Sequence, residues 1–365
     1  MSEWQTFCLK DLGKIVGGAT PSTNNPKNYG NKIAWITPKD LSTLQGRYIK
    51  KGSHSISRLG FKSCSCVLLP KHAILFSSRA PIGYVAIAKK RLCTNQGFKS
   101  IIPNKKIYFE FLYYLLKYHK DNISNIGGGT TFKEVSGATL GLFEVKIPPT
   151  YYEQQKIART LSILDQKIEN NHKINELLHT LAYKIYEYYF KYKPKNAKLE
   201  QIIIENPKSS IMVKNAQKTQ DKYPFFTSGD NILSYPKAII DGRNCFLNTG
   251  GNAGIKFYVG KASYSTHTWC ICANEFSDYL YLLLSSIKNH INQSFFQGTS
   301  IKRLQKNLLK KYPIYMPSAH EIKKFNQIII PLLTLISINT RTSKKLEQIR
   351  DFLLPLLLKQ QVKPK

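Results

Sequence analysis

The stretch from Glu153 to Tyr192 contains neither proline nor glycine and carries core-type residues at alternating steps of four and three. This spacing is that of a heptad seam, in which one face of a long helix packs against a second helix. The predicted seam residues are Ile157, Leu161, Leu164, Ile168, Asn171, Asn175, Leu178, Ala182, Ile185 and Tyr189. Because so long a face cannot stay unpaired, this feature constrains the fold more than any other.

A second helix with the same pattern lies near the C-terminus. Adding 168 to each seam position gives Phe325, Ile329, Leu332, Ile336, Asn339, Ser343, Leu346, Arg350, Leu353 and Leu357. Asn171 is matched by Asn339; an asparagine in such a seam specifies register at some cost in stability, or else marks a frayed or exposed layer. Pro331 and Pro355 fall inside the second pattern, so we expect that helix to be kinked or to begin or end near them.

The segments before the two helices also correspond. In each copy a Gly-Thr-Ser/Thr-apolar-Lys turn, 129–133 or 298–302, precedes a short strand, a proline and a helix that opens with glutamate. Further upstream, residues 33–40 match 223–230, residues 74–83 match 245–254, and the turn 94–96 matches 266–268. The chain therefore contains two diverged copies of one unit.

Each copy alternates short β-branched and aromatic runs with turns rich in Gly, Pro, Asn and Ser, and ends with one helical stretch, Phe109–Lys117 or Tyr279–His290. We therefore predict an α+β protein: two mixed α/β domains, each followed by a long helix, with the two helices pairing. The predicted segments are domain 1–150, helix 151–193, domain 194–318 and helix 319–365.

Composition narrows the function. Lys and Arg number 54 against 22 Asp and Glu, a formal net charge of +32. So large a charge favours a nucleic-acid partner, with a solvated basic surface as the alternative. The most apolar runs, Ile328–Ile338 and Phe352–Leu358, are shorter than the ~20 residues of a membrane span. The N-terminus lacks a signal-peptide pattern, and the seven cysteines lack disulfide-scaffold density, so we expect a cytoplasmic protein.

Motifs for metal binding and catalysis are incomplete. Cys64/Cys66 and Cys270/Cys272 have C-x-C spacing, but no nearby pair completes four ligands, so we expect small buried side chains rather than a zinc site. A Walker A loop and an N/D-P-P-Y/F loop are both missing, and the E-x-K spacing at Glu144 is not repeated in the second copy. The chain alone is therefore predicted not to be an enzyme.

Five segments, in this order, resemble the specificity subunit of type I restriction–modification systems. They are Leu12–Ile15 with Gly18-Ala19-Thr20-Pro21-Ser22, then Trp35–Leu41, Ser78–Gly83 and Glu153–Ala158. The resemblance covers nearly the whole chain. The second copy departs from it, because it lacks Gly-x-Thr-Pro-Ser and has Gly250-Gly251-Asn252 where the first has Arg79-Ala80-Pro81.

The resemblance implies that each α/β domain is a target-recognition domain reading one half of a split sequence in double-stranded DNA. It implies that the helices form an antiparallel coiled coil, which separates the readers and docks two methyltransferase (modification) subunits, with restriction/translocase subunits joining that core. S-adenosylmethionine, ATP and Mg would then act in the partner subunits only, and this chain would hold no cofactor.

Candidate DNA contacts lie in turns. Arg and Lys suit guanine or phosphate, Asn and Gln suit adenine, and Ser and Thr suit either. The candidates are Lys39, Ser77, Ser78, Arg79, Asn95, Gln96 and Lys133 in the first domain, and Ser228, Asn248, Thr249, Asn252, His267 and Lys302 in the second. The glycines at 127–129 and 250–251 would let the backbone approach phosphate. Two other functions stay open: a non-specific basic scaffold for nucleic acid, and the specificity part of a fused or self-sufficient restriction or methylation enzyme.

Overall fold

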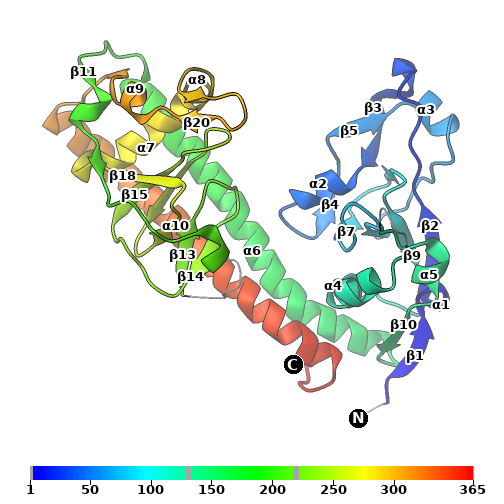
Figure 1. Ribbon diagram of the computed structural model, residues 1–365. Coiled ribbons are helices and arrows are strands. Elements are labelled where there is room, and N and C mark those ends of the chain that lie inside the picture. Colours follow the sequence, from blue (N-terminus) through cyan, green and yellow to red (C-terminus); the bar gives the residue numbers. More distant parts are fainter. Residues whose placement is uncertain (1–2, 129–132, 217–221, 365) are drawn as a thin grey trace. The chain divides into compact units, whose positions relative to one another are not determined.

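The computed structural model describes residues 3–128, 133–216 and 222–364. The chain divides into two compact units: unit 1 comprises Met1–Asn170 and Lys345–Lys365, and unit 2 comprises Asn171–Lys344. Two long helices, α6 (Tyr151–Tyr186) and α10 (Ala319–Leu358), each contribute a segment to both units (Figure 1). Residues 151–170 of α6 and 345–358 of α10 belong to unit 1, and the other residues of the two helices belong to unit 2.

Unit 1 contains a five-stranded sheet and a three-stranded sheet. The larger sheet has the order β2 (Gly13–Gly17), β9 (Lys99–Pro103), β6 (Ile74–Phe76), β7 (Val85–Ala88), β4 (Tyr48–Ile49). The smaller has the order β5 (His54–Ile56), β3 (Tyr29–Ile36), β8 (Cys93–Thr94). Around them lie α1 (Leu9–Leu12), α2 (Pro38–Ser42), α3 (Arg58–Lys62), α4 (Phe109–Asn125) and α5 (Gly137–Gly141). A ribbon of β1 (Gln5–Cys8) and β10 (Glu144–Ile147) leads into α6.

Unit 2 repeats this plan with a smaller main sheet. That sheet has the order β12 (Ile204–Glu205), β18 (Thr268–Cys272), β15 (Arg243–Asn248), β16 (Ile255–Val259), beside the sheet β14 (Leu233–Tyr235), β13 (Tyr223–Phe226), β17 (Ser263–Tyr264). Helices α7 (Ser277–Ser286), α8 (Lys288–Ser294) and α9 (Lys306–Lys310) follow. Two short ribbons complete the unit: β11 (Ala197–Lys198) with β21 (Pro313–Ile314), and β19 (Phe296–Gln297) with β20 (Arg303–Leu304).

Strand pairing confirms the internal repeat. In unit 1 Ile74 pairs with Ile87 on one side and Ile101 on the other. In unit 2 Cys245, the residue matched to Ile74, pairs with Phe257 and Ile271 in the same antiparallel sense.

The three-stranded sheets also show the repeat, and they correct the alignment of one pair of turns. Ile36 pairs in parallel with Thr94, and its match Phe226 pairs in parallel with Tyr264. The amide after each partner then donates to the same strand: Asn95 to the Ile36 carbonyl, and Ser265 to the Phe226 carbonyl. Asn95 therefore corresponds to Ser265, two positions before His267. The sequence match of residues 94–96 to 266–268 is therefore wrong by two positions. It aligns Thr94 with Thr266, whereas the strand pairing aligns Thr94 with Tyr264.

The predicted helical stretches form the centre of each core. The stretch Phe109–Lys117 is the first half of α4, whose Phe111 and Leu112 are fully buried in one cluster with Ile157 and Leu161 of α6. In unit 2 the predicted stretch is divided between α7 and α8, and α7 packs against the end of α6 and the start of α10. Each long helix is therefore part of a domain core.

Within each unit the segments of α6 and α10 run antiparallel. In unit 2 the Asn171 amide donates to Ser343 Oγ over 3.2 Å, and the Asn339 amide donates to Asn175 Oδ1 over 2.9 Å. In unit 1 Arg350 pairs with Asp165 over 2.7 Å. All predicted seam residues are buried or half-buried. The seam asparagines thus bond across the helix pair.

The expected effect of the prolines on α10 is only partly observed. The helix runs without interruption through Pro331 and ends at Leu358, shortly after Pro355. Pro331 and Gln327 are exposed, so the Gln327 carbonyl that loses its helical partner lies where water reaches it. A proline on the outer face therefore does not end this helix.

An arginine attaches each globular part to its helix segment. Arg47, in unit 1, is 3% exposed; it bonds Glu110 of α4 over 2.9 Å and Glu169 of α6 over 3.2 Å. Burial opposes its charge, but Tyr114 and the carboxylates around the guanidinium outweigh burial and keep the Arg47 pKa above its usual value.

Unit 2 has an equivalent attachment. Arg243 pairs with Asp278, and it donates to Thr334 Oγ1 of α10 over 2.9 Å. The offset that relates the two helix seams also relates Asp278 to Glu110 and Ser337 to Glu169. Ser337 accepts the Val259 amide over 3.0 Å, as Glu169 accepts the Arg47 amide over 2.9 Å. The repeat therefore includes the way in which each domain is fixed to the helices.

Two further observations concern the cysteines and the helices. Cys66, Cys93, Cys245 and Cys270 are buried in apolar surroundings. Over residues 3–128, 133–216 and 222–364, no cluster of three or more His, Cys, Asp or Glu has the arrangement of a metal site. Within the same ranges, no helix is long and apolar enough to span a membrane.

Candidate nucleic-acid interface

The loop that follows β6 in unit 1 is held by two buried serines. Ser77 Oγ donates to the Pro81 carbonyl and accepts the Tyr84 amide, both over 2.8 Å. The amide and hydroxyl of Ser78 donate to the Gly97 carbonyl over 2.8 and 3.3 Å. Both serines are fully buried, so this conformation does not present them to DNA. The two serines shape the loop, and their contact with DNA stays a prediction.

The loop after β15 in unit 2 is held in the same way. Asn248, itself buried, donates through its amide to the Asn252 carbonyl over 3.1 Å. The amide and hydroxyl of Thr249 donate to the His267 carbonyl over 3.2 and 2.8 Å, and Ser228 Oγ donates to the same carbonyl. All three predicted contacts therefore bond the backbone of the protein; Asn248 is buried, whereas Thr249 and Ser228 stay half-exposed.

A later segment of each unit joins this loop. The Val135 amide donates to the Ser78 carbonyl over 3.0 Å, and the Leu304 amide donates to the Thr249 carbonyl over 3.1 Å. These bonds bring Lys133 and Lys302 to the loop. Part of the glycine–threonine turn of unit 1, residues 129–132, lies outside the described residues; its glycines at 127–128 are described.

The remaining predicted residues gather around these loops. Arg79, Asn95 and Gln96 lie near the unit 1 loop, and Pro38, the neighbour of exposed Lys39, packs on Gly97. In unit 2, Asn252, His267 and Lys302 are exposed around the loop. The structure thus collects the candidates of each domain into one loop cluster, while their contact with DNA stays a prediction.

The charges on the two clusters differ. In unit 1 Glu134 accepts bonds from Arg79 over 3.3 Å and from Lys99 over 3.2 Å. Asn95 Oδ1 accepts the Gly97 amide over 3.0 Å, and Thr20 Oγ1 donates to Gln96 Oε1. Several polar groups of this cluster are therefore partly engaged before any ligand arrives.

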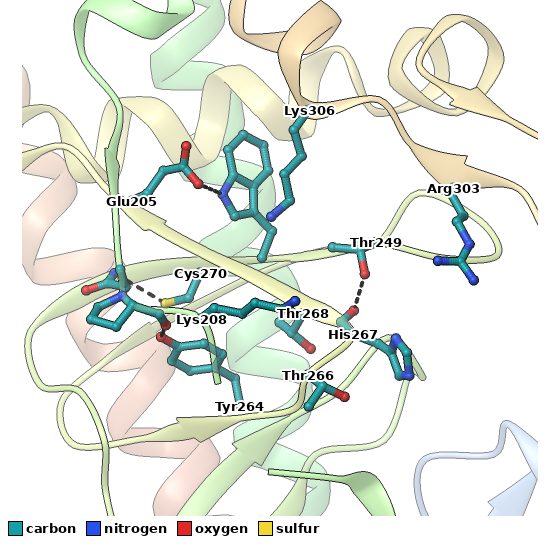
Figure 2. Close-up of a pocket in the computed structure, with 13 residues that line it drawn as sticks. Glu205, Lys208, Thr249, Tyr264, Thr266, His267, Thr268, Cys270, Arg303 and Lys306 are labelled. Carbon is teal, nitrogen blue, oxygen red and sulfur yellow. Dashed lines mark hydrogen bonds between the residues drawn. The ribbon is translucent and has the colours of Figure 1, made fainter. Parts of the chain in front are cut away.

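Unit 2 has a basic hollow of about 550 Å³ beside its loop. Figure 2 shows Lys208 and Lys306 directed into it, with Arg303 and His267 at its other end. The Trp269 ring forms part of the wall, with Lys306 Nζ 5.0 Å from the ring centroid. A cationic groove with an aromatic wall is suited to a nucleic-acid strand.

One acidic side chain lies at this hollow, and it is already paired. Glu205 accepts the Trp269 indole N–H over 2.8 Å and forms an ion pair with Lys310. The bond from Lys310 lowers the Glu205 pKa, and burial lowers the Lys306 pKa. The carboxylate therefore fixes the tryptophan and leaves the hollow positive.

Sequence reasoning missed Lys208, Trp269, Arg303 and Lys306. They come from β12, β18, β20, α9 and the loops between them, so no local motif joins them. The available signal was the repeat: Arg303 occupies the position that Glu134 has in the first copy, a reversal of charge next to the matched lysines.

A family model for the type I restriction modification DNA specificity domain matches residues 1–180 and 195–348. The chain belongs to this family. The two matched regions correspond to the two copies of the repeat, and the family is that of the specificity subunits of type I restriction–modification systems.

Curated relatives and a solved structure agree. The chain is 33% identical to the type I restriction enzyme MjaIX specificity subunit of Methanocaldococcus jannaschii, over 98% of this chain and 93% of that protein. It is 31% identical to the HindI specificity subunit of Haemophilus influenzae, over 46% of this chain and 37% of that one. The S subunit of M. genitalium shares the fold, with a TM-score of 0.65 at 18% identity, over 98% of this chain and 96% of that one.

Proposed function

We propose that this specificity subunit reads a split DNA site, one half with the loop cluster of each unit. The observation that carries the proposal is the repeated loop frame: equivalent backbone bonds hold the loops after β6 and β15, whereas the exposed side chains on them differ. Two readers of one architecture with different surfaces are suited to two different half-sites. The net charge of +32 supports a polyanionic partner.

We further propose that the long helices dock methyltransferase subunits. In unit 2, Ile174, Leu177 and Leu181 lie on one face of α6, and Tyr188 continues it; Leu177 is 71% and Tyr188 85% exposed. An apolar stripe on the solvent side of a helix is typical of a protein interface. The occupant that fits the family is a modification subunit, and restriction subunits would join that assembly.

In this proposal the chain is not itself catalytic. It positions the complex on DNA, while S-adenosylmethionine, ATP and Mg act in the partner subunits. The support is the family, together with the lack of a complete catalytic motif in the sequence.

Methylation sequencing of host DNA, with and without the gene for this chain, tests the proposal. The expected result is the loss of one split methylation motif when the gene is removed, and its return with the wild-type gene. Unchanged methylation in all motifs would overturn the proposal, and methylation by the purified chain alone would show an enzyme instead.

The docking part has its own test. Leu177→Lys and Leu181→Lys together should abolish co-purification with the modification subunit while leaving DNA binding by the purified chain intact. Glu176→Lys, a charge change at a neighbouring exposed position of α6, is the control. Retained co-purification of the double variant would contradict docking on this stripe.

A further inference from the structure

The position of Arg303 in the unit 2 loop cluster is equivalent to that of Glu134 in unit 1. Glu134 exchanges backbone bonds with Gly128, and Arg303 pairs with Gln297. The next residue in each unit donates to the loop after the central strand, as described above. One backbone position therefore carries a carboxylate in one reader and a guanidinium in the other.

The surroundings of this position also change. In unit 1 the residue that faces Glu134 is Arg79; the equivalent residue in unit 2 is Gly250. Gly251 has φ +80°, and a Cβ built on it would meet nothing within 4 Å. Its counterpart Ala80 has φ 52°, so the two loops share this backbone conformation. Where the first reader has the Arg79 side chain, unit 2 therefore has none, because Gly250 carries no side chain, and the position of Gly251 is open.

Arg303 has no acceptor within residues 3–128, 133–216 and 222–364. Among the described residues, its exposed guanidinium takes part in no hydrogen bond or ion pair, and the carboxylate of Glu205 is engaged with Trp269 and Lys310. Lys302, Lys208 and Lys306 add to the cationic surroundings. A guanidinium held by a fixed backbone, among like charges and without a partner, is available for an acceptor on a ligand.

We propose that Arg303 reads a guanine in the half-site bound by unit 2. The proposal rests on the proposed function and names one specificity-determining residue within it. The planar guanidinium matches the O6 and N7 acceptors of guanine in the major groove through two parallel bonds. Lysines 208, 302 and 306 supply the phosphate contacts from the same cluster. The first reader has a carboxylate at this position and therefore lacks this contact.

The test uses the full chain in complex with its modification subunit, with Arg303→Ala and Arg303→Lys variants. Methylation sequencing should show that one position of one half-site loses its requirement for guanine, with discrimination falling by about 10-fold or more. The other half-site should be unchanged, which also shows that the variant folds and assembles. Arg303→Lys keeps the charge but not the paired donors, so it should relax the same position.

Lys302→Ala is the matched control, since it removes a neighbouring exposed cation. It should weaken binding similarly at all sequences and reduce the dependence of log affinity on log salt by about one. If Arg303→Ala behaves like this control, and Arg303→Lys restores wild-type specificity, the residue binds phosphate and the proposal is overturned. An unchanged motif and affinity would also overturn it. Failure of the wild-type chain to direct any methylation would instead overturn the proposed function.

Discussion

Ser77 in unit 1 and Asn248 in unit 2 occupy equivalent positions, and each donates to the carbonyl four positions further along the chain. Ser78 and Thr249 likewise donate twice to one carbonyl of the neighbouring turn. Short polar side chains thus replace one another where they hold the loop. Beside them, by contrast, the half-buried Glu134 of unit 1 is replaced by the exposed Arg303 of unit 2. The loop conformation is thus preserved by hydrogen bonds to backbone carbonyls, which do not depend on the identity of the other side chains. The remaining residues of the loops are therefore free to diverge.

The attachments to the helices show a second contrast. Arg47 contacts Glu110 and Glu169 and comes within 3.9 Å of Asp165, whereas Arg243 pairs with Asp278 as its one carboxylate within the described residues. Arg47 lies in the bend before β4, whereas Arg243 is the first residue of β15. Glu110 and Asp278, however, are related by the same offset as the two helix seams. The acidic residue near the start of α4 or α7 is therefore the part of the attachment that both units share.

The largest expected effect comes from breaking this attachment. Arg47→Ala should destabilise unit 1 by about 3–5 kcal/mol, because it leaves buried carboxylates without their cation. Arg243→Ala should destabilise unit 2 by less, since Arg243 is 21% exposed and loses one carboxylate partner. Hydrogen exchange, resolved by unit, measures both. Lys50→Ala, at an exposed position near Arg47, is the control; equal losses for the two arginines would contradict the contrast.

A smaller effect should come from the polar layer of the helix pair in unit 2. Asn175→Leu should cost about 1–3 kcal/mol, because Asn339 then lacks the acceptor that lies 2.9 Å from its amide. Asn175→Leu with Asn339→Leu should recover most of that loss, since both polar groups are then removed together. Chemical denaturation of wild type, the two single variants and the double variant measures the coupling free energy between the two asparagines. Purely additive losses would show that the two asparagines act independently.

The smallest effect concerns the start of α10. Ser318 Oγ and Glu321 form a reciprocal cap, as Thr150 and Glu153 do at the start of α6. Ser318→Ala should cost about 1 kcal/mol. The Ser318 amide and then the Tyr315 hydroxyl lower the Glu321 pKa. Glu321 therefore stabilises the fold above the unfolded pKa of about 4.3, and this contribution is lost as pH falls through the lower folded pKa.

Denaturation of wild type and Glu321→Gln between pH 7 and pH 3 measures this linkage. The difference between the two proteins should shrink as the pH falls. A difference that stays constant over this range would contradict the assigned ionisation. Thr150→Ala removes the corresponding cap at the start of α6, and its loss of unfolding free energy should be similar to that of Ser318→Ala.

The sequence alone predicts the parts of this fold that depend on local periodicity. The seam from Ile157 to Tyr189 and its copy from Phe325 to Leu357 predict α6, α10 and their pairing, because heptad spacing is readable without tertiary contacts. The matches of Ile36 to Phe226 and Ile74 to Cys245 also predict equivalent strands.

The candidate site is less predictable. Ser77, Ser78 and Asn248 have the composition of exposed turns, but whether a polar side chain in a turn faces solvent or bonds the backbone depends on the strands beside it. Arg303 becomes a candidate only after β20 is placed against the loop after β15. The charged side chains of the site can therefore be identified only from the tertiary structure, whereas the strands and helices that carry them can be predicted from the sequence.

The most direct test of the account replaces the second reader, residues 194–318, with the first reader, residues 1–150, and sequences the methylated DNA of a host that carries the altered subunit. If the two units are interchangeable frames with different reading surfaces, the methylated motif should contain the first half-site twice and lose the second. If the original motif persists, or if methylation still depends on the second half-site, the claim that each unit reads its own half is contradicted.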